Sequence, residues 1–293
     1  MRCLATLFLF LLLSCSAQAA PAAAELLPNI VAAETVYADI ARSIAPPGTH
    51  IVALIANPAQ DPHLFEAGPA AARQLSAATI VIYNGAGYDP WMRDLLASTA
   101  GPRPRQVIDV ADLVHAASGG NPHLWYDPHT GLALATVLAA RLSVAEPRAQ
   151  AAITQRLARF RATIATLETE MAKLSARHPH APIAATEPVF GLMLNALGFR
   201  TLDPDFELAV QNNVEPAASS LAALQDALRK HAAAALIVNT QAETDLTRHL
   251  MQVARHNHVP IVEVSETEPA GLGYAAWLTR ELAALSTALD AAP

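Results

Sequence analysis

One long helical pattern constrains the fold of this chain more than any other feature. In residues 147–177, apolar side chains recur at spacings of three and four, as at Ile153, Phe160 and Leu174. This spacing places them on one face of an α-helix of about 30 residues, which at 1.5 Å per residue is about 45 Å long. Such a helix can support two lobes at once and would restrict their relative movement.

Short β-branched segments alternate with helical patterns on both sides of this helix. We predict buried strands at Asn29–Ala33, His50–Ile55, Thr79–Tyr83, Gln106–Val110, Pro182–Ala185, Ala235–Val238 and Pro260–Val264. We predict helices at Thr35–Ala45, Pro69–Ser76, Pro90–Thr99, His129–Ser143, Val189–Leu197, Ser219–His231, Thr244–Asn257 and Tyr274–Leu289. This alternation indicates an α/β protein with largely parallel sheets. We expect an N-terminal α/β lobe at 20–146, the linking helix at 147–177 and a C-terminal α/β lobe at 178–293.

The first residues have the pattern of an export signal. Arg2 precedes an apolar run at Leu4–Leu13, and Ala17 and Ala19 form an A-x-A cleavage site, which predicts a signal peptide at residues 1–19. The alternative is lipoprotein processing, with Cys15 acylated and the mature chain anchored by lipid. No later segment has the roughly 18 uninterrupted apolar residues of a membrane span. We therefore expect a periplasmic or otherwise extracytoplasmic protein.

Charge and cysteine content exclude several classes of function. The formal net charge is −7 and only 15% of the residues are charged, which is the opposite of the basic surface that binds nucleic acid. The only cysteines are Cys3 and Cys15, so the body of the chain has no disulfide, thiolate metal site or catalytic thiol. Any bound ligand must therefore be held by oxygen and nitrogen atoms.

Four polar residues follow predicted strands, two in each half of the chain. His63 and His123 come from the loops after His50–Ile55 and Gln106–Val110, while Glu187 and Glu266 directly follow strands of the second half. In parallel sheets, ligand-binding groups gather beyond the carboxyl ends of strands. Both histidines occur as Pro-His-Leu followed by an aromatic residue. The glutamates alone could instead be carboxylates at helix N-termini, where they would interact with the helix dipole.

These motifs together resemble a known family. The chain has two Pro-His-Leu-aromatic motifs, Asn84-Gly85-Ala86-Gly87 with Trp91, Trp125-Tyr126-Asp127-Pro128, the long central helix and Thr186-Glu187-Pro188-Val189-Phe190-Gly191. This set resembles the cluster A-I solute-binding proteins of metal ABC transporters, the zinc and manganese receptors. The resemblance implies two α/β lobes joined by one long rigid helix, with a metal ion in the cleft between them. It also implies delivery of that ion to a membrane ABC permease.

The resemblance assigns a ligand to each of the four strand ends. His63 matches the first ligand, with Glu66 as a structural carboxylate beside it, and His123 matches the second. Glu187 occupies the third position, which is commonly His in zinc receptors and Glu in manganese-type receptors. Glu266 stands where the family usually has Asp, and Glu268, two residues further on, could replace it. The loop at 114–121 lacks the long His-rich insertion of many zinc receptors.

The donor chemistry agrees with a captured dication. Two imidazoles and two carboxylates give a net ligand charge of −2, which would neutralise a divalent ion in a partly buried cleft. Nitrogen and oxygen donors suit Zn²⁺, Mn²⁺ and Fe²⁺, whereas Cu⁺ prefers sulfur. The ligand set does not select among the first three ions, although the Irving–Williams order favours zinc over manganese.

Two other functions are alternatives to a metal receptor. A metal-dependent hydrolase would keep an open coordination position for water, but four converging side chains favour capture, and no HExxH or Gly-x-Ser-x-Gly motif occurs. A siderophore or cobalamin receptor of the same build would have an open cleft without converging ligands. We therefore predict a monomeric metal-binding protein without catalytic activity or nucleic-acid partner.

Overall fold

The computed structural model describes residues 28–57, 65–99, 105–212 and 214–291. The predicted signal peptide at 1–19, Cys15 and the predicted ligand His63 lie outside these ranges. Within the described residues, none of the helices combines the length and apolar character needed to span a bilayer.

The N-terminal lobe is built on a parallel four-stranded sheet with the order β2-β1-β3-β4. Its strands are β1 (Asn29–Glu34), β2 (His50–Ile55), β3 (Ile80–Tyr83) and β4 (Gln106–Asp109). Helices α2 (Pro69–Ala77) and α3 (Trp91–Ser98) pack on one face, and α1 (Thr35–Ile44) and α5 (Pro128–Ala145) on the other. The chain leaves β1 for β2 on one side and β3 for β4 on the other, so the topological switch point lies between β1 and β3.

The C-terminal lobe repeats this plan with the strand order β6-β5-β7-β8, also entirely parallel. The strands are β5 (Pro182–Ala185), β6 (Arg200–Leu202), β7 (Ala235–Asn239) and β8 (Ile261–Val264). Helices α9 (Ala218–Arg229) and α10 (Asp245–His256) cover one face, and α7 (Gly191–Ala196) and α11 (Tyr274–Asp290) cover the other. Here the switch point lies between β5 and β7. The predicted fold of two parallel-sheet α/β lobes and a long helix is confirmed.

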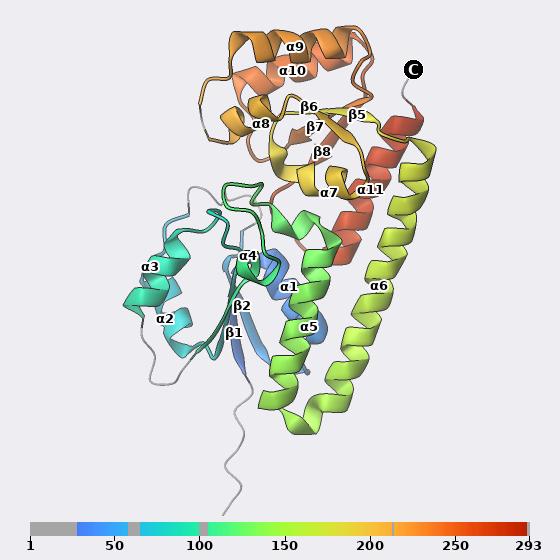
Figure 1. The fold of residues 1–293 in the computed structure, drawn as a ribbon. Coiled ribbons are helices and arrows are strands. Elements are labelled where there is room, and N and C mark those ends of the chain that lie inside the picture. Colours follow the sequence, from blue (N-terminus) through green and yellow to red (C-terminus); the bar gives the residue numbers. More distant parts are fainter. Residues whose placement is uncertain (1–27, 58–64, 100–104, 213, 292–293) are drawn as a thin grey trace, which may run out of the picture.

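Helix α6 (Gln150–Arg177) runs along both lobes and packs against α1, α5 and α11 (Figure 1). A 3-10 turn at Pro147–Ala149 precedes it. Its apolar face, including Ile153, Phe160 and Leu174, belongs to one continuous core that contains residues of both sheets. The two lobes are therefore joined by a shared apolar core rather than by a flexible linker.

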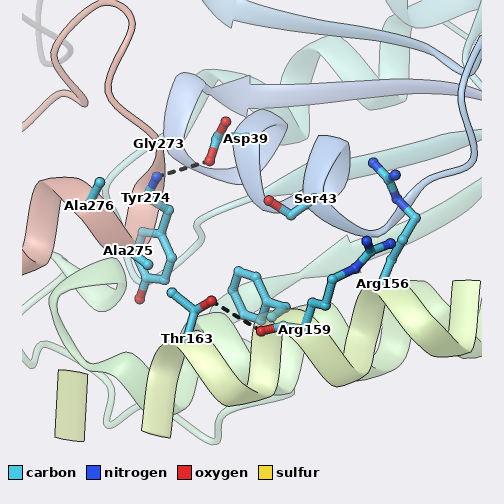
Figure 2. Close-up of a pocket in the computed structure, with 10 residues that line it drawn as sticks. Asp39, Ser43, Arg156, Arg159, Thr163, Gly273, Tyr274, Ala275 and Ala276 are labelled. Atoms are coloured by element: carbon cyan, nitrogen blue, oxygen red, sulfur yellow. Dashed lines mark hydrogen bonds between the residues drawn. The ribbon is translucent and has the colours of Figure 1, made fainter. Parts of the chain in front are cut away.

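Tyr274, at the start of α11, makes the central contacts of this junction. Its backbone N–H donates to Asp39 Oδ2 of α1 at 2.9 Å, as Figure 2 shows, and its hydroxyl donates to the carbonyl of Trp125 at 2.8 Å. Its ring stacks on Phe160 of α6 at 6.2 Å between centroids. Gly131 of α5 makes room for the ring, because a Cβ at that position would lie 2.4 Å from Tyr274 Cε1. One residue thus connects α1, α5, α6 and α11.

Among the described residues, one strand and two α-helices were not predicted from the sequence, apart from a short 3-10 turn at Leu124–Tyr126. They are strand β6, helix α4 (Val110–Leu113) and helix α8 (Pro204–Gln211). The first two are short, so periodicity gives little signal. Helix α8 does have a start signal in the sequence. Asp203 caps the helix by accepting a hydrogen bond from the N–H of Phe206, and Pro204 occupies its first position. The helix predicted at Val189–Leu197 is also divided, into a 3-10 turn at Pro188–Phe190 and α7.

Candidate metal centre

His123 is fully buried and held in one orientation by Asn121. The Oδ1 atom of Asn121 accepts hydrogen bonds from the His123 backbone N–H at 3.0 Å and from Nδ1 at 2.8 Å. The amide orientation follows from its other end, where Nδ2 donates to the carbonyl of Pro188. Because an amide oxygen only accepts, Nδ1 of His123 carries a proton, which leaves Nε2 as the atom that could bind a metal.

Aromatic rings surround the His123 imidazole. The Tyr88 and Trp125 rings lie edge-to-face against it, with centroids at 5.8 and 5.5 Å. Trp125 also packs against Tyr37, and its side chain is fully buried. These rings exclude water from His123 and prevent rotation of the imidazole, so its Nε2 atom faces a fixed direction.

The Nε2 atom of His123 faces Glu266, which belongs to the other lobe. The Nε2 atom of His123 lies 3.1 Å from Glu266 Oε1, and Glu266 is 5% exposed. Glu266 follows β8 after one residue, and its backbone N–H donates to Gln241 Oε1 at 2.6 Å. The structure therefore brings together one predicted ligand from each half of the chain, as expected from their positions beyond strand ends.

Glu187 lies at the switch point of the C-terminal sheet. It follows β5, and its Oε2 accepts a hydrogen bond from Asn239 Nδ2, at the end of β7, at 2.7 Å. The Asn239 Oδ1 atom in turn accepts from the backbone N–H of Gln241 at 3.0 Å. Because Gln241 also holds Glu266, a continuous hydrogen-bonded path connects both predicted ligands of the C-terminal lobe.

Two other residues named from the sequence, Glu66 and Glu268, have different surroundings from the His123–Glu266 pair. Glu66 is exposed. Glu268 is 9% exposed, and burial, followed by the nearby Asp39 carboxylate, raises the pKa of Glu268 to about 9. Its charged neighbours, Asp39 and Arg42, belong to α1, so Glu268 faces the junction of the lobes rather than His123.

The described part of the chain contains no group of three or more His, Cys, Asp or Glu residues arranged to hold a metal ion. Two of the predicted ligands, His123 and Glu266, are in contact. The third, Glu187, is bound to Asn239, and the fourth, His63, is outside the described ranges.

Two buried acids lie at the switch point of the N-terminal sheet, at Glu34 and Asp89. Asp89 accepts hydrogen bonds from the N–H groups of Asn84 and Gly85, yet burial raises its pKa to about 6. Burial, followed by repulsion from Asp89, raises the pKa of Glu34 well above its ordinary range.

Gly85 has a φ of 72°, and a Cβ there would lie 2.2 Å from Asp109 Oδ1, so glycine is required in this turn.

The residues that orient the predicted ligands were not expected from the sequence. They are Asn121, Asn239 and Gln241. A signal existed for Asn239 and Gln241, because Asn239 directly follows the predicted strand Ala235–Val238 and Gln241 comes two residues later. Polar residues at the end of a central parallel strand are candidates for supporting a ligand site.

Curated proteins of similar sequence include substrate-binding lipoproteins of ABC transporters. The iron ABC transporter substrate-binding lipoprotein MtsA of Streptococcus pyogenes serotype M1 is 25% identical over 178 residues, which is 57% of each protein. The metal ABC transporter substrate-binding lipoprotein ScbA of Streptococcus cristatus is 28% identical over 131 residues, which is 41% of this chain and 42% of that protein. The chain thus spans about half the length of these curated relatives.

The fold also occurs in solved structures. The periplasmic zinc-binding protein TroA of Treponema pallidum superposes with a TM-score of 0.73 at 19% identity, covering 90% of this chain and 99% of that one. The model of the family described as ZnuA, zinc-uptake complex component A periplasmic, matches residues 30–288, nearly all of the described chain. This chain belongs to that family.

Proposed function

We propose that this protein is an extracytoplasmic receptor that captures a divalent transition metal ion and delivers it to a membrane ABC permease for import. The observation that carries the proposal is the pairing of His123 Nε2 with Glu266 Oε1 across the two lobes. A buried imidazole with a fixed tautomer beside a buried carboxylate is a donor pair suited to a dication. Family membership and the named functions of MtsA, ScbA and TroA support the same conclusion.

The proposed ligands are His63, His123, Glu187 and Glu266. Glu266 is preferred over Glu268 because Glu266 contacts His123, whereas the charged neighbours of Glu268 lie on α1. For Glu187, the support is its place beyond β5 and its hydrogen-bonded connection to the Glu266 loop. His63 is proposed from its motif and from the family resemblance.

The proposed cargo is Zn²⁺ or Mn²⁺, and Fe²⁺ fits the same donors. The relatives differ in the metal their names specify, with iron for MtsA and zinc for TroA. The Irving–Williams order makes zinc the tighter ligand in vitro, while the oxygen donor of Glu187 reduces that advantage. A signal peptide at 1–19, a monomeric state and the absence of catalysis complete the proposal.

The direct test is metal binding by the mature protein and by His123→Ala. We expect one metal ion per chain, and a loss of affinity in His123→Ala larger than the roughly 10–100-fold that removal of an outer-shell partner costs. His249→Ala, which removes an exposed histidine of α10, should bind as the parent does. Competition titration with a chromophoric chelator measures all three constants. Equal affinity of parent and His123→Ala would refute the proposed site.

A second test separates the candidate metals. Glu187→His would give three imidazoles and one carboxylate, the set typical of zinc sites. We expect the variant to keep zinc and to lose most of its manganese affinity. Unchanged manganese binding would show that Glu187 does not touch the ion and serves only as the hydrogen-bond partner of Asn239.

A further inference from the structure

Glu281 is a buried carboxyl that connects the loops of two proposed ligands. It lies in α11 and is 3% exposed. Its Oε1 atom accepts hydrogen bonds from Trp277 Nε1 at 2.7 Å and from the backbone N–H of Ser265 at 3.2 Å. Its Oε2 atom lies 2.7 Å from the hydroxyl oxygen of Tyr126. Ser265 immediately precedes Glu266, and Tyr126 comes three residues after His123.

Counting protons at Tyr126 assigns a direction to its contact with Glu281. The Tyr126 hydroxyl also lies 2.6 Å from the carbonyl oxygen of Ser265, and a carbonyl only accepts. A tyrosine has one hydroxyl proton, so donating it to Ser265 leaves none for Glu281. The contact at 2.7 Å is then a hydrogen bond only if Glu281 is a protonated acid that donates to Tyr126.

The environment of Glu281 agrees with a protonated acid. Burial, partly offset by the contacts with Tyr126, Trp277 and Ser265, raises the pKa of Glu281 to about 7. In its protonated form, both of its oxygens and its proton have partners of the correct kind. Ionisation would remove the donor that Tyr126 accepts from while leaving the desolvation penalty of a buried charge.

We propose that Glu281 is a positioning residue for metal capture, which as a carboxylic acid locks the Glu266 loop of one lobe to the His123 loop of the other. This inference rests on the proposed function, because it assumes that His123 and Glu266 bind the ion. The lock works through backbone atoms of Ser265 and the side chain of Tyr126. An apolar residue would fill the same space but would leave the N–H groups of Ser265 and Trp277 without an acceptor.

Three variants test the lock. Glu281→Gln has the shape of the protonated acid, with an oxygen that accepts from Trp277 and an NH₂ group that donates to Tyr126. Glu281→Met keeps the volume and removes these hydrogen bonds. Tyr126→Phe removes only the hydroxyl and keeps the ring. We expect Glu281→Gln to bind Zn²⁺ within about threefold of the parent, and the other two to bind about 10–100-fold more weakly.

The measurement is competition titration of Zn²⁺ on each full mature protein, with circular dichroism to establish that it is folded. Tyr83→Phe removes a tyrosine hydroxyl elsewhere in the N-terminal lobe and serves as the matched control. If Glu281→Met does not fold, the zinc affinity of Tyr126→Phe alone tests the lock. Parent-like affinity of a folded Glu281→Met or Tyr126→Phe would overturn the lock, and Glu281→Gln as weak as Glu281→Met would overturn the role of the acid proton. Parent-like affinity of His123→Ala would instead overturn the site itself.

Discussion

Glu207 should make the stability of the metal-free protein fall as pH rises. It lies in α8, is 3% exposed, and its Oε1 atom has no hydrogen-bond partner. Burial, with a further contribution from Asp203, raises the pKa of Glu207 from 4.5 to about 9. The folded protein therefore keeps a proton that the unfolded chain releases. The stabilising contribution of the Glu207 proton is fully present below pH 4.5 and is lost progressively between pH 4.5 and pH 9.

The size of the effect follows from the two pKa values. In the unfolded chain the carboxyl has a pKa of 4.5, so pH 7 is about 2.5 units above that pKa. At about 1.4 kcal/mol per unit, ionisation in the unfolded chain lowers the free energy of unfolding at pH 7 by about 3 kcal/mol. Glu207→Gln keeps the shape of the protonated acid and cannot ionise. We expect the variant to match the parent within about 1 kcal/mol at pH 5 and to exceed its stability by about 3 kcal/mol at pH 7.

Urea unfolding of metal-free parent and variant at a series of pH values measures this difference. Asp89, Glu268 and Glu281 also have raised pKa values, so they steepen the decline of both proteins and cancel in the comparison. Glu263→Gln, which removes an exposed carboxylate of β8, is the control variant. Stability curves of parent and Glu207→Gln that remain parallel from pH 5 to pH 8 would refute the reasoning.

Two further predictions concern the supports of the site and of the lobe junction. Asn239→Ala removes the hydrogen bond to Glu187 and should weaken metal binding about 10–100-fold in a competition titration, whereas unchanged affinity would exclude a role for this contact. Gly131→Ala should lower the free energy of urea unfolding by about 1–3 kcal/mol, because its Cβ overlaps the Tyr274 ring. Helix propensity alone predicts a gain of about 1 kcal/mol, so a stabilised variant would contradict the packing argument.

The repeating local pattern made most of the fold predictable. Strands such as His50–Ile55 and Pro182–Ala185 are short, β-branched or apolar runs, and their observed bounds agree with the predicted ones. His50–Ile55 is less buried than predicted, because it is an edge strand. The long helix was evident from its apolar spacing. Strand β6 was not, because three residues at a sheet edge have no period to detect. Its pairing with β5 is decided by tertiary contacts rather than by local sequence.

At the candidate site, the sequence predicted two residues that meet in the structure but not the residues that support them. His123 and Glu266 follow from residue type and from their places beyond strand ends, and they are in contact. Asn121 and Glu281 act through hydrogen bonds to residues in distant parts of the chain, such as Pro188 and Tyr126. A single sequence shows which residues are present but not which of them form hydrogen bonds with one another. The roles of such residues are therefore visible only in the folded structure.

The distribution of contacts between the lobes indicates how the proposed site could open. Beside the proposed ligands the lobes are connected by hydrogen bonds, such as that from Tyr126 to the Ser265 carbonyl, and by the ring contact of Tyr126 with Phe190. Each hydrogen bond is worth about 1 kcal/mol. At the lobe junction the connection is an apolar core in which Tyr274 stacks on α6. Separating that core would expose far more apolar surface than opening the polar contacts. Under the proposed function, entry and release of the ion would therefore involve movement of the ligand loops, with the shared core and α6 remaining packed.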